Sequence, residues 1–246
     1  MVDQDHQRRA ELVEGLAAVR TRLFEACSVA QRDVRSVTLI AVTKTYPAAD
    51  AATLVELGVR DLGESRDQEA AAKVGQVRAR LDLRDLDDGV PRWHFVGRLQ
   101  SRKSRSVAGY ATAVHSLDRV TLVADLAAAV ARLDRRPLEI FVQVSLDGDP
   151  QRGGAAAADL LPLADETASR PELRLRGVMA VGPLGMDPDR AFAELEEISA
   201  RLRTQHPTAD AISAGMSTDL EQAVAHGATH VRVGSALLGL RSEVFG

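Results

Sequence analysis

Eight short runs of β-branched and apolar residues alternate along the 246-residue chain with longer segments rich in Ala, Leu, Glu and Arg. Strands that alternate with helical segments imply crossover units in a parallel sheet, and eight units are the number that closes a barrel. The sequence therefore predicts an α/β fold, a (β/α)8 TIM barrel. The predicted strands are Val37–Lys44, Val59–Gly63, Trp93–Gly97, Ala113–Leu117, Leu138–Ser145, Leu175–Val181, Ala211–Ala214 and His230–Gly234.

An amphipathic helix is predicted ahead of the first strand. Over residues 7–27, Leu12, Leu16, Val19 and Leu23 recur every three or four positions and form one apolar face. No G-x-G-x-x-G follows the first strand, which argues against an open doubly wound sheet, the main structural alternative. No repeat or Pro/Gly-rich linker divides the chain, so a single domain over residues 1–246 is expected.

Composition excludes several classes of protein. Hydrophobic residues make up 45% and charged residues 27% of the chain, a balance typical of a globular domain with a sizeable core. The net charge of −4 is spread in mixed signs, which does not favour nucleic acid as a partner. The single cysteine, Cys27, cannot form an internal disulfide, and neither a membrane span nor a signal peptide is apparent. A cytoplasmic location without membrane contact is expected.

Lys44 ends the first predicted strand, in the stretch LIAVTKTYP. Alternate residues of a barrel strand face the interior, so Ile40, Val42 and Lys44 share one face. Barrel enzymes place their chemistry at the carboxyl ends of the strands, where a desolvated lysine can attack a carbonyl and form a Schiff base. The alternative is a lysine whose ammonium merely reaches solvent past the rim.

Two small-residue turns follow the seventh and eighth predicted strands. The first is Gly-Met-Ser-Thr, in which Ser217 is predicted to cap the next helix, and the second is Gly234-Ser235. Each is more often a plain turn than a binding site when taken alone. Phosphate sites in such barrels are commonly built from the loops after these two strands, so together the turns indicate a phosphate site.

Six spaced blocks resemble the signature sequences of the pyridoxal phosphate homeostasis protein family, single-barrel relatives of the N-terminal domain of alanine racemase. The resemblance covers nearly the whole chain in the right order. The blocks are AVTKTYP, LGESRDQEAAAK, WHFVGRLQSRKSR, VHSLDR, RGVMAVGP and SAGMSTDLEQAVAHGATHVRVGSALLG.

The resemblance implies a cofactor and the residues that bind it. Lys44 would hold pyridoxal 5′-phosphate (PLP) as an internal aldimine, and Ser217, Gly234 and Ser235 would bind the phosphate. Arg232 would face the pyridine nitrogen. Strand alternation agrees with this role, because it turns Arg232 to the side opposite its two valine neighbours. An arginine has only donors, which suit an unprotonated ring nitrogen. A surface ion pair is the alternative use of Arg232.

The chain departs from the family pattern at three positions. Ser65 stands where the family usually has Asn, Arg102 replaces the usual Asn before Lys103, and Arg152 replaces a frequent lysine near the fifth strand. Arg152 cannot form a second Schiff base. The role of the Ser65 position is left open, as are those of Lys103 and Tyr46. His94 is interpreted as a hydrogen-bonded structural residue, Trp93 and Cys27 as packing residues, and Lys103 as part of a solvated basic cluster.

Two functions from different classes fit these observations. One is a carrier without turnover that maintains PLP and supplies it to PLP-dependent apoenzymes; the other is an amino-acid racemase of the alanine racemase type. Racemisation needs an acid or base on each face of the substrate carbon, and the family's racemases take the second from a further domain that this sequence is not expected to contain. The carrier interpretation is therefore favoured, as a monomer and with no metal.

Overall fold

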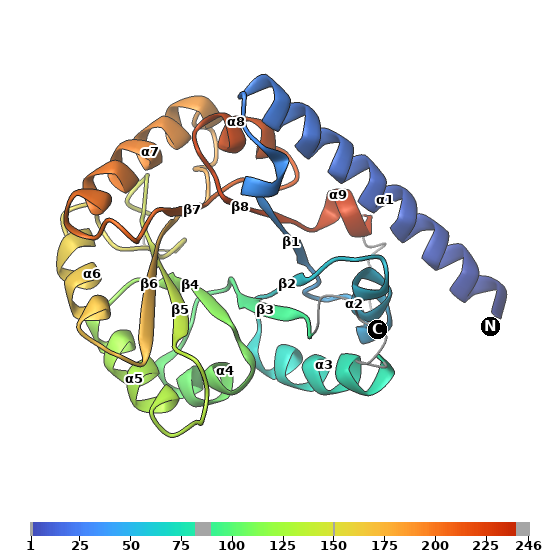
Figure 1. Cartoon of the computed structure of the whole chain (residues 1–246), viewed down its shortest axis with the longest axis horizontal. Helices are drawn as coiled ribbons and strands as arrows, with labels where there is room; N and C mark the ends of the chain where they lie inside the picture. Colours follow the sequence, from blue (N-terminus) through green and yellow to red (C-terminus); the bar gives the residue numbers. More distant parts are fainter. Residues whose placement is uncertain (1, 82–89, 150, 240–246) are drawn as a thin grey trace.

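The chain forms a closed barrel of eight parallel strands in which each strand pairs with the next and β8 pairs with β1. The computed structural model describes residues 2–81, 90–149 and 151–239. Figure 1 shows the helices arranged around the strands, with α1 on the outside beside α8 and α9. The strands are β1 Thr38–Val42, β2 Asp61–Glu64, β3 Arg92–Phe95, β4 Ala113–Leu117, β5 Leu138–Gln143, β6 Leu173–Met179, β7 Ala211–Ser213 and β8 His230–Val233.

The predicted TIM barrel and its N-terminal helix are confirmed. Helix α1 extends further than predicted, because the apolar stripe marks only its buried face and polar residues continue the helix at its start. The helices are α1 Val2–Val29, α2 Ala48–Glu56, α3 Asp67–Arg80, α4 Ser104–Tyr110, α5 Val120–Val130, α6 Leu160–Ala168, α7 Pro188–Gln205, α8 Leu220–Ala225 and α9 Ser235–Leu238, with 3-10 turns η1 Val34–Ser36 and η3 Ser101–Lys103.

The apolar core lies mainly between the strands and the helices. Val231 and Val233 are fully buried on that side of β8, as the alternation predicts, and Trp93 and Cys27 belong to the same core. The barrel interior is different, because its small apolar cluster around Phe141 is surrounded by buried polar side chains. A barrel interior of this kind must satisfy each polar group internally.

Candidate functional site

Lys44 lies in a turn at the carboxyl-terminal mouth of the barrel. The prediction that β1 continues to Lys44 is wrong, since the strand ends at Val42. The amide of Tyr46 donates to the carbonyl of Thr43 (3.1 Å), and Thr45 has a positive φ of 68°, which an extended strand does not allow. The Lys44 side chain is consequently exposed at the rim rather than desolvated inside the barrel.

A buried lysine fixes the turn on both sides of Lys44. The Nζ of Lys73, on α3, donates to the carbonyl of Thr43 (2.6 Å) and to the carboxylates of Glu64 (2.7 Å) and Glu69 (3.0 Å). Glu69 also accepts from the amide of Thr45 (2.5 Å). These contacts hold the turn in a conformation with a positive φ at Thr45, in which the Lys44 side chain is exposed.

Glu64 is the electrostatically unusual member of this cluster. It is fully buried at the end of β2, and its Oε1 accepts from Thr43 Oγ1 (2.7 Å) as well as from Lys73. Its Oε2 is buried and has no hydrogen-bond partner among the described residues. Burial raises the pKa of Glu64, although Lys73 and Thr43 act in the opposite direction. Sequence reasoning missed this cluster, for which the spacing of Glu69 and Lys73 by one helical turn was the available signal.

The two small-residue turns come together at the same mouth. Ser235 Oγ donates to Ser217 Oγ (3.2 Å), and the amide of Ala236 donates to the same oxygen (3.2 Å). Gly234 lies against β1, since an added Cβ would sit 3.4 Å from the carbonyl oxygen of Val42. The predicted phosphate residues Ser217, Gly234 and Ser235 therefore form one group beside the end of β1.

The prediction that Ser217 caps a helix is wrong. Helix α8 begins at Leu220, with Asp219 in the N-cap position, and the Asp219 carboxylate accepts from the amide of Met216 (2.6 Å). Because Asp219 closes the turn, the Ser217 hydroxyl is directed to the turn after β8. Arg22 of α1 supports this arrangement by donating to the carbonyl of Ser217 (2.9 Å) while pairing with Glu221 (2.8 Å).

Arg232 is buried in the barrel interior, at the level of the carboxyl ends of β6 and β7. Its Nη1 donates to Ser213 Oγ (2.7 Å) and its Nη2 to the carbonyl of Ala180 (2.8 Å). Burial lowers the pKa of Arg232 to about 10, with the charge of Asp219 acting in the opposite direction. The guanidinium is therefore still protonated at neutral pH, and the alternative of a surface ion pair is wrong.

Other residues singled out in the sequence have defined contacts. Tyr46 Oη donates to the carbonyl of Gly239 (2.5 Å), and the Arg8 guanidinium lies 5.9 Å from the centre of its ring. Lys103 is not simply solvated, because its Nζ pairs with Asp67 (3.2 Å). Arg152 pairs with Asp147 (3.2 Å) and donates to the carbonyl of Gly182 (2.5 Å).

Two further positions, Ser65 and His94, are explained by backbone packing and by a buried hydrogen-bond chain. The backbone of Ser65 lies so close to Gly97 that a Cβ on Gly97 would overlap the Ser65 carbonyl oxygen. His94 is hydrogen-bonded on both ring nitrogens, to Asp61 (2.8 Å) and to His115 (2.9 Å), as expected for a structural histidine.

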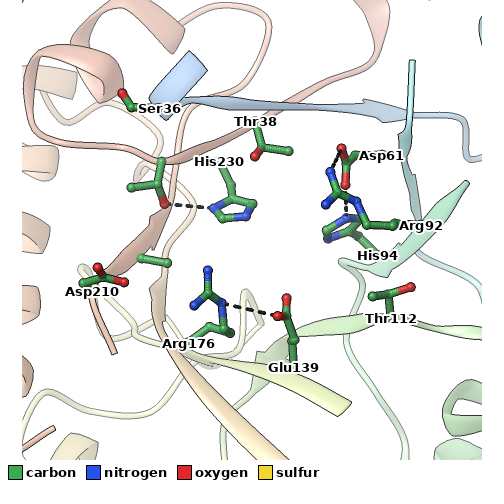
Figure 2. A pocket seen from close by; sticks show the side chains of 12 residues that line it. Ser36, Thr38, Asp61, Arg92, His94, Thr112, Glu139, Arg176, Asp210 and His230 are labelled. Carbon is green, nitrogen blue, oxygen red and sulfur yellow. Dashed lines mark hydrogen bonds and ion pairs between the residues drawn. The ribbon is translucent and has the colours of Figure 1, made fainter. Parts of the chain in front are cut away.

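A cavity of about 320 Å³ opens at the opposite, amino-terminal mouth of the barrel. Figure 2 shows its charged lining, in which Arg92 contacts Asp61 and Arg176 contacts Glu139. Lys44 and the two serine turns do not line this cavity, so it is separate from the candidate site. In the described ranges, neither a metal-binding cluster of His, Cys, Asp or Glu nor a helix suited to crossing a membrane is found.

Comparison with known proteins places the chain in a family. A family model described as the N-terminal domain of alanine racemase matches residues 17–242. The pyridoxal phosphate homeostasis protein of Mycobacterium leprae is 42% identical over 97% of this chain and 96% of its own length. The PipY protein of Synechococcus elongatus, solved with PLP bound, superimposes with a TM-score of 0.78 and 33% identity, covering 93% of this chain and all of PipY.

The barrel is also found within larger enzymes. Alanine racemase of Corynebacterium glutamicum matches 93% of this chain with a TM-score of 0.61, but the match covers 62% of that enzyme and is 14% identical, which shows a shared fold alone. The chain belongs to the alanine racemase N-terminal domain family and, within it, to the pyridoxal phosphate homeostasis proteins.

Replacing the buried Lys73 by Met should lower the free energy of unfolding by about 3–5 kcal/mol, because the change leaves the Glu64 charge buried without its cation. The loss should shrink as the solution is acidified. Lys73 lowers the pKa of Glu64, so its removal should place that pKa higher in the variant than in wild type. Protonation of Glu64 then stabilises the folded variant as pH falls through that pKa, and the effect is complete below the ordinary value of about 4.3. Urea unfolding at several pH values measures both effects.

Two further variants serve as controls for that experiment. Adding Glu64→Gln to Lys73→Met should recover much of the lost stability, because the buried charge is removed as well. Arg9→Met breaks the exposed pair with Glu56 and should cost less than about 1 kcal/mol. A Lys73→Met protein as stable as wild type at neutral pH would contradict the assignment of a buried ion pair.

Proposed function

We propose that this protein binds PLP at the carboxyl-terminal mouth of its barrel, holds it through a Schiff base on Lys44, and maintains the cytoplasmic supply of PLP for apoenzymes. The observation that supports it most is the convergence at one mouth of an exposed lysine on a clamped turn, a pair of serine turns and a buried arginine. The relatives named pyridoxal phosphate homeostasis proteins and the PLP-bound PipY support the same function.

The residues present suit the phosphate group. The hydroxyl of Ser235 and the amide of Ala236 each lie 3.2 Å from the hydroxyl oxygen of Ser217, and all three groups can donate instead to a phosphate oxygen. The Cβ of a larger residue at Gly234 would meet Val42 only at ordinary contact distance. Packing against β1 therefore does not require a glycine at position 234. A glycine there agrees with a close approach of the backbone to a ligand.

Arg232 suits the ring nitrogen of the same ligand. The structure gives two of its nitrogens protein acceptors, and a guanidinium has five donor N–H groups. A donor at this place leaves the ring nitrogen unprotonated, which weakens the ring as an electron sink. An arginine there therefore favours storage of the cofactor over carbanion chemistry.

The placement of both tyrosines supports a carrier over a racemase. Tyr46 directs its hydroxyl to the Gly239 carbonyl, and the hydroxyl of Tyr110 is buried on α4. Burial raises the pKa of Tyr110, so it is a poor proton donor or acceptor. Neither phenol is poised as an acid or base opposite Lys44. We propose the carrier as a monomeric single domain, with PLP-dependent apoenzymes as the partners that receive the cofactor.

Borohydride reduction of the protein loaded with PLP should attach the cofactor to Lys44. The sequence contains three lysines, and the other two, Lys73 and Lys103, are engaged in ion pairs. Peptide mapping by mass spectrometry identifies the modified residue. Lys44→Ala should lose the visible absorption of the Schiff base, whereas Lys103→Ala should keep it; a label on Lys73 or Lys103 in wild type would refute the assignment.

The phosphate should supply much of the affinity. We expect pyridoxal, which lacks the phosphate, to bind far more weakly than PLP. The double variant Ser217→Ala/Ser235→Ala should weaken PLP binding by about ten- to a hundredfold, because hydrogen bonds to a charged group are lost, and should leave pyridoxal binding unchanged. Fluorescence titration measures both ligands, with Ser169→Ala, after α6, as the control. Equal losses for the two ligands would remove the serines from the phosphate site.

The protein loaded with PLP should not racemise alanine at a useful rate, because Lys44 can serve only one face of the substrate carbon. The measurement is exchange of the alanine Cα hydrogen in D2O, followed by NMR from either enantiomer, with an alanine racemase as positive control. Turnover that disappears in Lys44→Ala would replace the carrier proposal by the racemase alternative.

A further inference from the structure

A continuous chain of hydrogen bonds runs through the barrel interior, away from Arg232. Arg232 Nη1 contacts Ser213 Oγ (2.7 Å), which contacts His115 Nδ1 (2.8 Å). His115 Nε2 contacts His94 Nδ1 (2.9 Å), and His94 Nε2 contacts Asp61 Oδ1 (2.8 Å). Five strands contribute one residue each, and the chain links the carboxyl-terminal side of the barrel to the amino-terminal mouth.

The two ends fix the direction of the outer bonds of this hydrogen-bond chain. A guanidinium has no acceptor, so Arg232 must donate to Ser213, and a carboxylate has no donor, so Asp61 must accept from His94. With neutral histidines, one arrangement of protons satisfies the two inner bonds. Ser213 donates its hydroxyl proton to His115 Nδ1, and His115 donates from Nε2 to His94 Nδ1. In this arrangement both histidines carry their proton on Nε2.

The surroundings of His115 favour its neutral form. His115 is fully buried and stacks on Phe141 with ring centres 4.2 Å apart. Burial lowers the pKa of His115 well below its usual value, and the buried charge of Arg232 acts in the same direction. An added proton at neutral pH is thus disfavoured at the centre of the chain.

Asp61 anchors the far end. Burial acts to raise the pKa of Asp61, but the hydrogen bonds from His94 and Arg92 outweigh it and keep the pKa below its usual value. Figure 2 shows Asp61 in contact with both Arg92 and His94 on one wall of the amino-terminal cavity. The end of the chain is therefore a carboxylate that stays charged at neutral pH.

We propose that Ser213, His115 and His94 are positioning residues that hold Arg232 in one orientation and keep it a hydrogen-bond donor toward the ligand at the carboxyl-terminal mouth. The acceptors of Arg232 lie at the ends of two strands, because Ser213 is the last residue of β7 and Ala180 directly follows β6. Two bonds to rigid strand ends fix the guanidinium plane. The proposal rests on the proposed function, since the ligand in question is the PLP ring nitrogen.

The variant that tests the proposal is Ser213→Ala, which removes the acceptor of Arg232 and the donor to His115 together. We expect this change to weaken PLP binding by about tenfold and to shift the pH titration of the bound cofactor's visible absorption. Ser213→Thr keeps the hydroxyl and should titrate like wild type. Ser199→Ala removes another buried serine hydroxyl, on α7, that has no partner among the described residues, and should also titrate like wild type.

A second measurement does not need the cofactor. Nitrogen-15 NMR of the histidine rings in the ligand-free protein should show His115 neutral, with the proton on Nε2, at neutral pH. In Ser213→Ala, His115 should lose this fixed tautomer.

The two measurements separate the possible failures. A wild-type His115 that carries its proton on Nδ1, or is charged, would overturn the proposed chain, as would a Ser213→Ala titration identical to wild type. Wild type that binds no PLP would overturn the proposed function and, with it, the role given to Arg232.

Discussion

The hydrogen bonds between β1 and β8 close the sheet and create the candidate site. Their register pairs Thr38 with His230 and Ala41 with Val233, so the residues that follow the two strands emerge side by side. Lys44 and Gly234 are brought to one rim by this pairing although nearly the whole chain lies between them. Parallel strands have all their carboxyl ends on one side, and the turns after β7 and β8 therefore complete a single mouth.

The interior of this barrel is more polar than a barrel filled by branched apolar side chains. Burying polar groups is unfavourable unless each has a partner, and the chain from Arg232 to Asp61 provides those partners in a fixed order. The buried positive charge of Arg232 interacts with the charge of Asp219, whereas Asp61 at the other end pairs with Arg92. The polar side chains of the interior thus supply the hydrogen-bond partners that a buried, charged arginine requires.

The barrel fold by itself does not determine the chemistry of a protein. The barrel shared with alanine racemase gives the architecture, whereas function depends on local features of the site. In this chain the turn of Lys44 is clamped by Lys73, and the phenol of Tyr46 is engaged with the backbone at Gly239. These contacts leave Lys44 exposed and the Tyr46 hydroxyl engaged, which supports the proposed role of Lys44 in holding an aldehyde.

The sequence by itself determined the order of the elements, the number of strands and the faces of β8, because strand periodicity and crossover connections are local properties. It also indicated the two serine turns, though not that Asp219, rather than Ser217, caps α8. The end of β1 at Val42, the Lys73 clamp and the histidine chain were decided only by the tertiary structure. Their contacts join residues far apart in the chain, such as His115 and Ser213, 98 positions apart, and only closure of the barrel brings such pairs together.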